Sequence, residues 1–183
     1  MKKSVLTFGL ISGVIMSLLM DGTVLLSDKI GSGHSLILGY ANMVAAFLLI
    51  YFGIRSYRDN TLAGRISFSR AFACGILITL ITTVCYVATW EVIYFKFIPH
   101  FMDSYWAAQI AKVQARGLDA ATTAAKIAEI QQSQQSYQNP LVNMAYTAME
   151  PLPVGILITL ISAGILRRKA TAQPKGASAV MTT

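Results

Sequence analysis

Charged residues are scarce in this chain. Only 13% of the 183 residues are charged, and 8 acidic residues stand against 15 lysines and arginines. Apolar residues make up 55%, and they cluster in long runs, which excludes a disordered chain and exceeds what a soluble core needs. Because the basic residues lie at the ends of the apolar runs, the charge of +7 indicates membrane topology, and no nucleic-acid partner is expected.

Cysteine and the common catalytic motifs are also missing or rare. Cys74 and Cys85 share one apolar run, and a helix would separate them by about 16 Å, too far for a disulfide. No CxxC, P-loop, GxGxxG, HExxH or GxSxG pattern occurs, and His34 and His100 follow no metal-ligand spacing. No metal or cofactor is therefore expected, and the chain is not expected to be an enzyme.

Four apolar segments are long enough to form membrane helices. A bilayer core needs about 20 mostly apolar residues, and the segments lie at about residues 4–26, 36–54, 72–98 and 151–167. Asn139-Pro140 predicts a helix start ahead of the fourth span, with Pro151 and Pro153 kinking or re-capping that helix. The predicted fold is an all-α integral membrane protein, a four-helix transmembrane bundle forming one domain over 1–169. The small, polar tail 170–183 is predicted to be disordered and cytoplasmic.

Three of these segments carry stripes of small residues at spacing i, i+4, i+8, which allow helices to approach closely. The stripes are Gly9, Gly13, Ser17; Gly75, Thr79, Thr83; and Gly155, Thr159, Ala163. The seven residues from Gly75 to Ile81 recur letter for letter from Gly155 to Ile161. Because their flanks differ, we interpret the recurrence as chance similarity between apolar helices, not as an inverted repeat.

Residues 101–138 are too polar to span a membrane. Trp106, Ile110 and Val113 share one helical face, Gly117 is a plausible C-cap, and Asp119 is a plausible N-cap for a second piece. We therefore expect an amphipathic helical insert of two short helices outside the hydrocarbon core, between the third and fourth spans.

With four spans, both termini and the linker between the second and third spans lie on one side. That side holds most of the basic residues, so the positive-inside rule places it in the cytoplasm and the insert 101–138 outside it. The basic residues are Lys2, Lys3, Arg55, Arg58, Arg65, Arg70, Arg167, Arg168, Lys169 and Lys175.

One stretch of the chain resembles a known family. The residues are Tyr51-Phe52-Gly53-Ile54-Arg55-Ser56-Tyr57-Arg58-Asp59, Gly64-Arg65-Ile66-Ser67-Phe68, and Ala71-Phe72-x-x-Gly75, followed by Trp90-Glu91-x-x-Tyr94 and Pro153-x-Gly155. They are similar to an uncharacterised bacterial membrane protein family known as domain of unknown function 4199, over most of the chain to about Lys169. The resemblance implies a small bacterial membrane protein, with no assigned activity, substrate or catalytic residue. With the topology above, the expected location is the bacterial cytoplasmic (inner) membrane, with both termini in the cytoplasm.

Four polar residues are predicted at similar depth, in or near the outer half of the bundle. Asp21, Asn42, Glu91 and Glu150 lie about 18–28 Å from the inner ends of their helices, in a core about 30 Å thick. Because ionisable groups at this depth usually face a cavity, the bundle interior or water, they are candidates for an outward-facing polar pocket for a cation or protonatable ligand. The alternative is that they only mark the outer interface, with Glu150 capping the Pro151 helix and Glu91 paired with Lys96 or Trp90.

Four arginines, Arg55, Arg58, Arg65 and Arg70, are predicted in or beside one short linker. They are candidate inner-leaflet contacts to anionic headgroups, with Phe68 and Phe72 inserted. The alternative is ordinary positive-inside topology combined with the lead-in to a helix.

The function that these patterns favour is non-enzymatic: a small membrane interaction or accessory protein. Its expected partners are the lipid bilayer, anionic headgroups, and another membrane protein or a second copy of the chain. The alternative is a small transporter or ion- or ligand-binding protein that uses the acidic cluster. A lipid-modifying enzyme is disfavoured, because no nucleophile–base or metal pattern is visible.

Overall fold

The computed structural model describes residues 1–30, 32–98, 100 and 102–168, without the side chains of 27–30 and 32–36. The predicted tail 170–183 lies outside the described residues. No strand occurs in the described ranges, so the all-α class is confirmed. The helices, in order, are α1 (Lys2–Ile30), α2 (Ser32–Thr61), α3 (Phe68–Val92), the π-helical turn η1 (Ile93–Phe97), α4 (Asp103–Gln114), α5 (Ala120–Tyr137), α6 (Pro140–Met149) and α7 (Pro151–Leu166).

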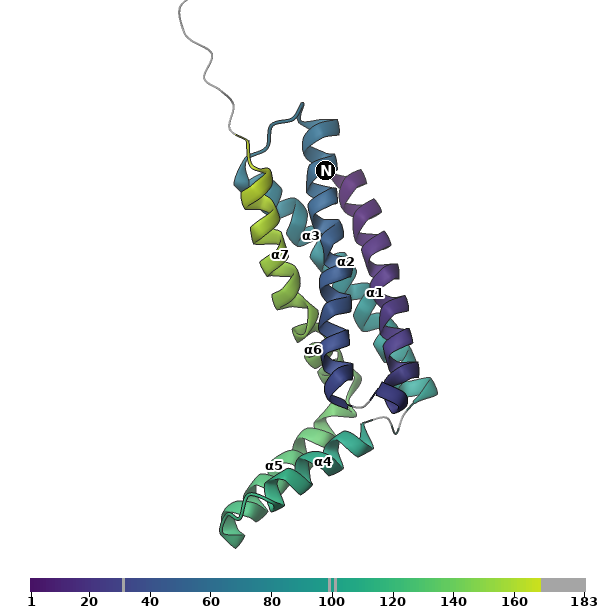
Figure 1. Ribbon diagram of the computed structural model, residues 1–183, viewed down its shortest axis with the longest axis vertical. Helices are drawn as coiled ribbons and strands as arrows, with labels where there is room; N and C mark the ends of the chain where they lie inside the picture. The colour runs from purple at the N-terminus through teal and green to yellow at the C-terminus, as the bar shows by residue number, and fades with distance from the viewer. Residues whose placement is uncertain (31, 99, 101, 169–183) are drawn as a thin grey trace, which may run out of the picture.

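Within the described ranges, four helical segments are long and apolar enough to cross a membrane: Lys2–Leu26, Ile37–Thr61, Phe68–Phe97 and Pro140–Leu166. Figure 1 shows them side by side, with the N-terminus, the α2–α3 connection and the end of α7 at one end of the bundle. Large apolar side chains face outward along them, including Leu18 (65% exposed), Val84 (67%) and Ile165 (66%). Such a belt would promote aggregation in water, so it supports a bilayer as the surrounding medium.

Two predicted span boundaries differ from the helices. The sequence predicts that the second span ends at residue 54, but α2 continues to Thr61, and in its last turns Asp59 pairs with Arg55 at i, i+4 and with the neighbouring Arg58. The fourth span includes α6, which begins at Pro140 with Asn139 as its cap, as the sequence indicates. Leu141 N donates to Asn139 Oδ1 (3.0 Å), and Pro151 then begins α7.

The small-residue stripe of α1 packs against α3. A Cβ added to Gly9 would lie 2.9 Å from Ile81 Cβ, and one added to Gly13 would lie 2.7 Å from Cys85 Sγ. One helical turn further, the hydroxyls of Ser17 and Thr89 lie 2.8 Å apart. The contact therefore follows i, i+4, i+8 on both helices, as expected for close approach at small residues.

The two copies of the repeated heptapeptide meet face to face. A Cβ at Gly75 of α3 would lie 2.6 Å from Thr159 Cγ2, and a Cβ at Gly155 of α7 would collide with Thr79 Cγ2. The hydroxyls of Thr79 and Thr159 lie 3.3 Å apart. Because α3 and α7 run in opposite directions, each glycine receives the threonine of the other copy. The two identical heptapeptides therefore pack against each other, a contact that the interpretation as chance similarity did not predict.

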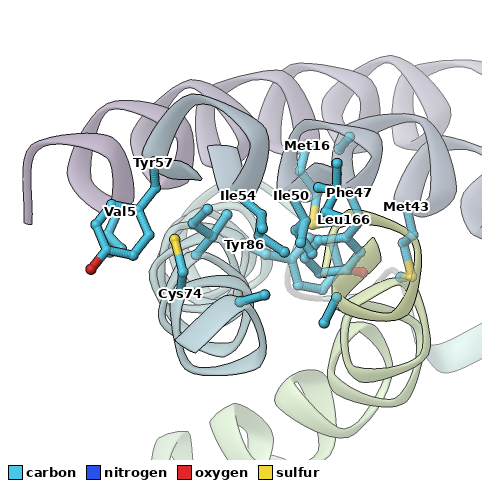
Figure 2. Packing of buried hydrophobic residues seen from close by; sticks show 14 of the residues in the cluster. Val5, Met16, Met43, Phe47, Ile50, Ile54, Tyr57, Cys74, Tyr86 and Leu166 are labelled. Atoms are coloured by element: carbon cyan, nitrogen blue, oxygen red, sulfur yellow. The ribbon is translucent and has the colours of Figure 1, made fainter. Parts of the chain in front are cut away.

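The core of the bundle lies on α2. Phe47, Ile50 and Ile54 are fully buried, and Figure 2 shows them among side chains of α1, α3 and α7. The Ser12 hydroxyl of α1 adds a hydrogen bond to the Ala46 carbonyl of α2 (2.9 Å). Buried hydroxyls thus supplement apolar packing, as is common where a surrounding lipid offers no hydrophobic drive between helices.

The predicted insert forms an antiparallel hairpin of α4 and α5, which projects from the end of the bundle opposite the N-terminus (Figure 1). Aromatic side chains anchor it: Tyr94 of η1 contacts Tyr137 (ring centroids 5.5 Å apart), and Tyr137 contacts Trp106 (6.0 Å). Gln138 Nε2 also donates to the Tyr94 hydroxyl (3.1 Å). The base of the hairpin is therefore attached to the third span through ring contacts.

Replacing the cap of α5 is expected to loosen the first turn of the hairpin. Asp119 is the N-cap, as predicted, and its Oδ1 accepts from Thr122 N (2.9 Å). Hydrogen bonding by the Thr122 side chain, and then by this backbone amide, lowers the pKa of the carboxyl. Its contribution is therefore present above the pKa of an unfolded aspartate and is lost as pH falls through the lowered folded-state pKa. Asp119→Ala should accelerate amide hydrogen exchange in this turn at neutral pH, whereas Asp119→Asn should not; equal rates in all three proteins would contradict the assignment.

Candidate functional site

A cavity of about 180 Å³ lies within the bundle, on the side of the hairpin. Its volume equals that of roughly six water molecules at about 30 Å³ each. Helices α1, α2 and α3 and the α6–α7 junction contribute side chains to it. The lining residues are Met16, Met20, Thr23, Val24, Gly39, Asn42, Met43, Tyr86, Trp90 and Glu150.

Glu150 is the only charged side chain among the described residues that line the cavity. It occupies the N-cap position of α7 but makes no side-chain cap bond. Instead, the Tyr86 hydroxyl of α3 donates to Glu150 Oε2 (3.1 Å). The break between Met149 and Pro151 thus directs a carboxylate toward the third span, so Glu150 holds the expected cap position of the Pro151 helix but its side chain does not cap that helix.

The rest of the cavity lining consists mainly of an amide, aromatic rings and methionine side chains. Asn42 of α2 donates through Nδ2 to Thr23 Oγ1 (2.9 Å) and to the Leu19 carbonyl (3.3 Å), which ties α2 to α1 at the edge of the cavity. The Trp90 ring stacks on Tyr94 (centroids 5.7 Å apart), and its position next to Tyr86 follows from the i, i+4 spacing on α3. Three methionines add flexible thioether surface: Met16, Met20 and Met43.

Two of the four predicted pocket residues do not line this cavity. Asp21 and Glu91 are each one residue, or about 100° of helix rotation, away from the cavity-lining Met20 and Trp90. Asp21 continues the stripe through Ser17, which faces α3. One carboxylate oxygen of each acid, Asp21 Oδ1 and Glu91 Oε1, is buried without a hydrogen-bond partner among the described residues. Of the four predicted pocket residues, this cavity therefore includes Asn42 and Glu150.

Metal binding finds no support in the geometry. No three His, Cys, Asp or Glu side chains gather among the described residues in a way that could hold a metal ion. His100 Nδ1 contacts Asp103 Oδ2 (2.9 Å) at the exposed start of α4, while the side chain of His34 lies outside the described residues.

The comparisons with known proteins identify a family. The family model described as "Protein of unknown function (DUF4199)" matches residues 7–168. The chain belongs to this family. No curated protein and no solved structure matches the chain. The DUF4199 match covers most of the first span, all of the other three and the hairpin, so the cavity lies wholly within the family domain.

The arginine block of this DUF4199 chain differs from the linker cluster expected from the sequence. Arg55 and Arg58 lie on α2, Arg65 lies in the connection, and Arg70 lies in the first turn of α3. Arg58 is only 8% exposed, and its Nε and Nη2 donate to the two oxygens of Asp59 (2.7 and 3.1 Å). Arg58 is thus removed from the candidate headgroup contacts, because its guanidinium is buried and already paired.

Tyr86, Trp90 and the three methionines are functional candidates that were not predicted from the sequence. In an apolar run, aromatic residues and methionines at spacing i, i+4 look the same whether they fill a core or line a cavity. One signal could have found two of them. Tyr86 and Trp90 share a helical face of the predicted third span, and they lie at a depth in the membrane similar to that of Glu150.

Proposed function

We propose that this protein binds a small organic cation in the cavity between α1, α2, α3 and the α6–α7 junction. The observation that carries the proposal is the Glu150 carboxylate, which lines a cavity inside a membrane-spanning bundle and accepts from Tyr86. A carboxylate at this depth is costly unless it is paired or solvated. A cation would compensate that charge, so the proposed role is binding rather than catalysis.

The lining favours an organic ammonium over a hydrated metal ion. Tyr86 and Trp90 present aromatic rings to the cavity, and ammonium groups bind favourably to such rings. The remaining methionine, valine and glycine surface suits methyl or methylene groups. At about 180 Å³ the cavity has room for a group such as tetramethylammonium, but it is smaller than the sites of most drug-sized ligands.

Filling the cavity should abolish binding without disturbing the bundle. Gly39 lines the cavity, and nothing lies within 4 Å of a Cβ added there. In a thermal-shift assay of purified protein, tetramethylammonium chloride should stabilise the wild type more than an equal concentration of sodium chloride does. Gly39→Phe should remove this difference.

The matched control is Gly22→Phe, because Gly22 also has open space around its Cβ but does not line the cavity. Gly22→Phe should keep the ammonium-specific shift. Equal shifts in both variants, or no ammonium-specific shift in the wild type, would contradict the proposal.

A second candidate function is an interaction or accessory role carried by the α4–α5 hairpin. The hairpin projects beyond the bundle (Figure 1), and α5 has no buried residue. Cross-linking in native membranes followed by pull-down through a C-terminal tag should then recover one stoichiometric partner, cross-linked to residues of α4 or α5. Recovery of the monomer or a homo-oligomer alone would contradict this role.

We also propose that the end of the bundle with the N-terminus and the α2–α3 connection faces the cytoplasm of a bacterial cell. Lys2 and Lys3 begin α1 and Arg65 lies in the α2–α3 connection. The positive-inside rule places such residues inside. A reporter inserted after Gln135 should therefore report an extracytoplasmic location, and a cytoplasmic signal would reverse the topology.

A further inference from the structure

A second open site lies at the opposite, basic end of the bundle, between α1 and α2. It is a groove of about 390 Å³, formed mainly by one face of α2 with one side chain from α1. Its position is independent of the cavity at Glu150. The lining residues are Phe8, Leu49, Phe52, Arg55, Ser56, Asp59 and Asn60.

The groove is apolar at one end and polar at the other. Phe8, Leu49 and Phe52 form the part nearer the middle of the span. Arg55 lies six residues, or about 9 Å of helix, before the end of α2 at Thr61. This order matches the change from hydrocarbon to headgroup region that a lipid of the same leaflet would encounter.

The polar end carries a net positive charge once Arg58, which does not line the groove but pairs with its Asp59, is counted together with Arg55 and Asp59. Both oxygens of Asp59 accept from the nearly buried Arg58, so this acid is largely neutralised. Arg55 is more loosely held, with Nε 3.7 Å from Asp59 Oδ2 and 56% of its side chain exposed. Ser56 Oγ accepts from Asn60 Nδ2 (3.1 Å), which leaves the Ser56 hydroxyl proton for another acceptor.

We infer that this groove binds one anionic phospholipid, with its phosphate at Arg55 and Ser56 and an acyl chain along Phe8, Leu49 and Phe52. A guanidinium and a hydroxyl are suitable donors to phosphate oxygens. Basic pockets between membrane helices on the cytoplasmic side are known to hold anionic headgroups. The site explains the Tyr51–Asp59 block better than general positive-inside topology does, because four residues of that block line one groove.

Native mass spectrometry of detergent-purified protein titrated with phosphatidylglycerol tests this inference. The wild type should retain one phosphatidylglycerol in preference to phosphatidylcholine with the same chains. Arg55→Gln should weaken that first binding event by about tenfold, the loss expected for a charge-assisted contact.

Arg167→Gln is the matched control, since Arg167 is an exposed arginine at the same end of the bundle and does not line the groove. It should leave the first binding event within about twofold of wild type, because Arg167 does not line the groove and cannot contact a lipid phosphate held at Arg55 and Ser56. Equal losses of phosphatidylglycerol binding in both variants would show that only the overall charge of this end attracts lipid. They would overturn the proposal that the groove is the binding site.

Phe52→Ala separates a bound lipid from a bound phosphate group. Phe52 is 49% exposed, so its removal should leave the fold intact while shortening the apolar wall. We expect it to weaken phosphatidylglycerol retention severalfold without a change of charge. Wild-type retention in Phe52→Ala, or displacement of the lipid by an equal concentration of glycerol 3-phosphate, would overturn the acyl-chain contact.

Discussion

Gly155→Leu should destabilise the bundle by about 1–3 kcal/mol, the cost of overpacking a closely packed helix contact. A Cβ at this position meets Thr79 Cγ2 and lies 3.0 Å from Phe47 Cζ, and Phe47 is fully buried. The added side chain must therefore separate α7 from α3 and α2, since neither neighbour has space to withdraw. The free energy of unfolding in mixed SDS micelles measures this effect.

Gly164→Leu is the control on the same helix, because nothing lies within 4 Å of a Cβ at Gly164. Both exchanges gain the same helix propensity, about 0.8–1 kcal/mol, so their difference isolates the helix contact. The smaller exchange Gly155→Ala offers a second comparison. Adding Thr79→Ser to Gly155→Ala removes the Cγ2 that the new Cβ meets, and should restore part of the lost stability. If Gly155→Leu and Gly164→Leu unfold alike, α3 and α7 do not meet at the repeated heptapeptide.

Glu150→Gln should weaken tetramethylammonium binding by at least about tenfold, because a cation in a low-dielectric cavity loses its counter-charge. The exchange keeps the side-chain shape and an oxygen that can still accept from Tyr86. A loss therefore reports the charge and not the packing. Isothermal titration of tetramethylammonium into wild-type and variant protein provides the two affinities.

Glu91→Gln is the control for this prediction. Glu91 is also an acid of the membrane-spanning segments, but it does not line the cavity. It should bind tetramethylammonium within about twofold of wild type, as expected when a charge lies outside the site. Similar losses of affinity in both variants would show that the general negative charge of these acids, rather than the cavity at Glu150, attracts the cation.

The helical class and two helix N-caps could be predicted from local signals. Asn139 and Asp119 are caps because their side chains accept from nearby backbone amides, which depends on a few neighbouring residues. The all-α class followed from the length of the apolar runs. The stripes of Gly9 and Gly75 also indicated close helix contacts before any partner helix was known.

The sequence could not predict which side chains of different helices contact each other. Helical spacing places Glu150 on a face of the chain but does not say that Tyr86, 64 residues away, donates to it. Asp21 and Glu91 share the predicted depth of Glu150 but differ in rotation about their helices, which depth alone does not specify. The continuation of α2 through Arg58 was missed because a charged segment reads as a helix end unless its ion pairs are known.

The most direct test of the central claim measures the charge inside the cavity without assuming a ligand. Gly39→Cys, in a background with Cys74→Ala and Cys85→Ala, should prefer a trimethylammonium methanethiosulfonate over the sulfonate reagent of similar size by more than free 2-mercaptoethanol does, because a thiolate already reacts faster with the cationic reagent in solution. Adding Glu150→Gln should remove this excess preference. A rate ratio equal to that of free 2-mercaptoethanol, or an excess that survives Glu150→Gln, would contradict a cation-binding cavity centred on Glu150.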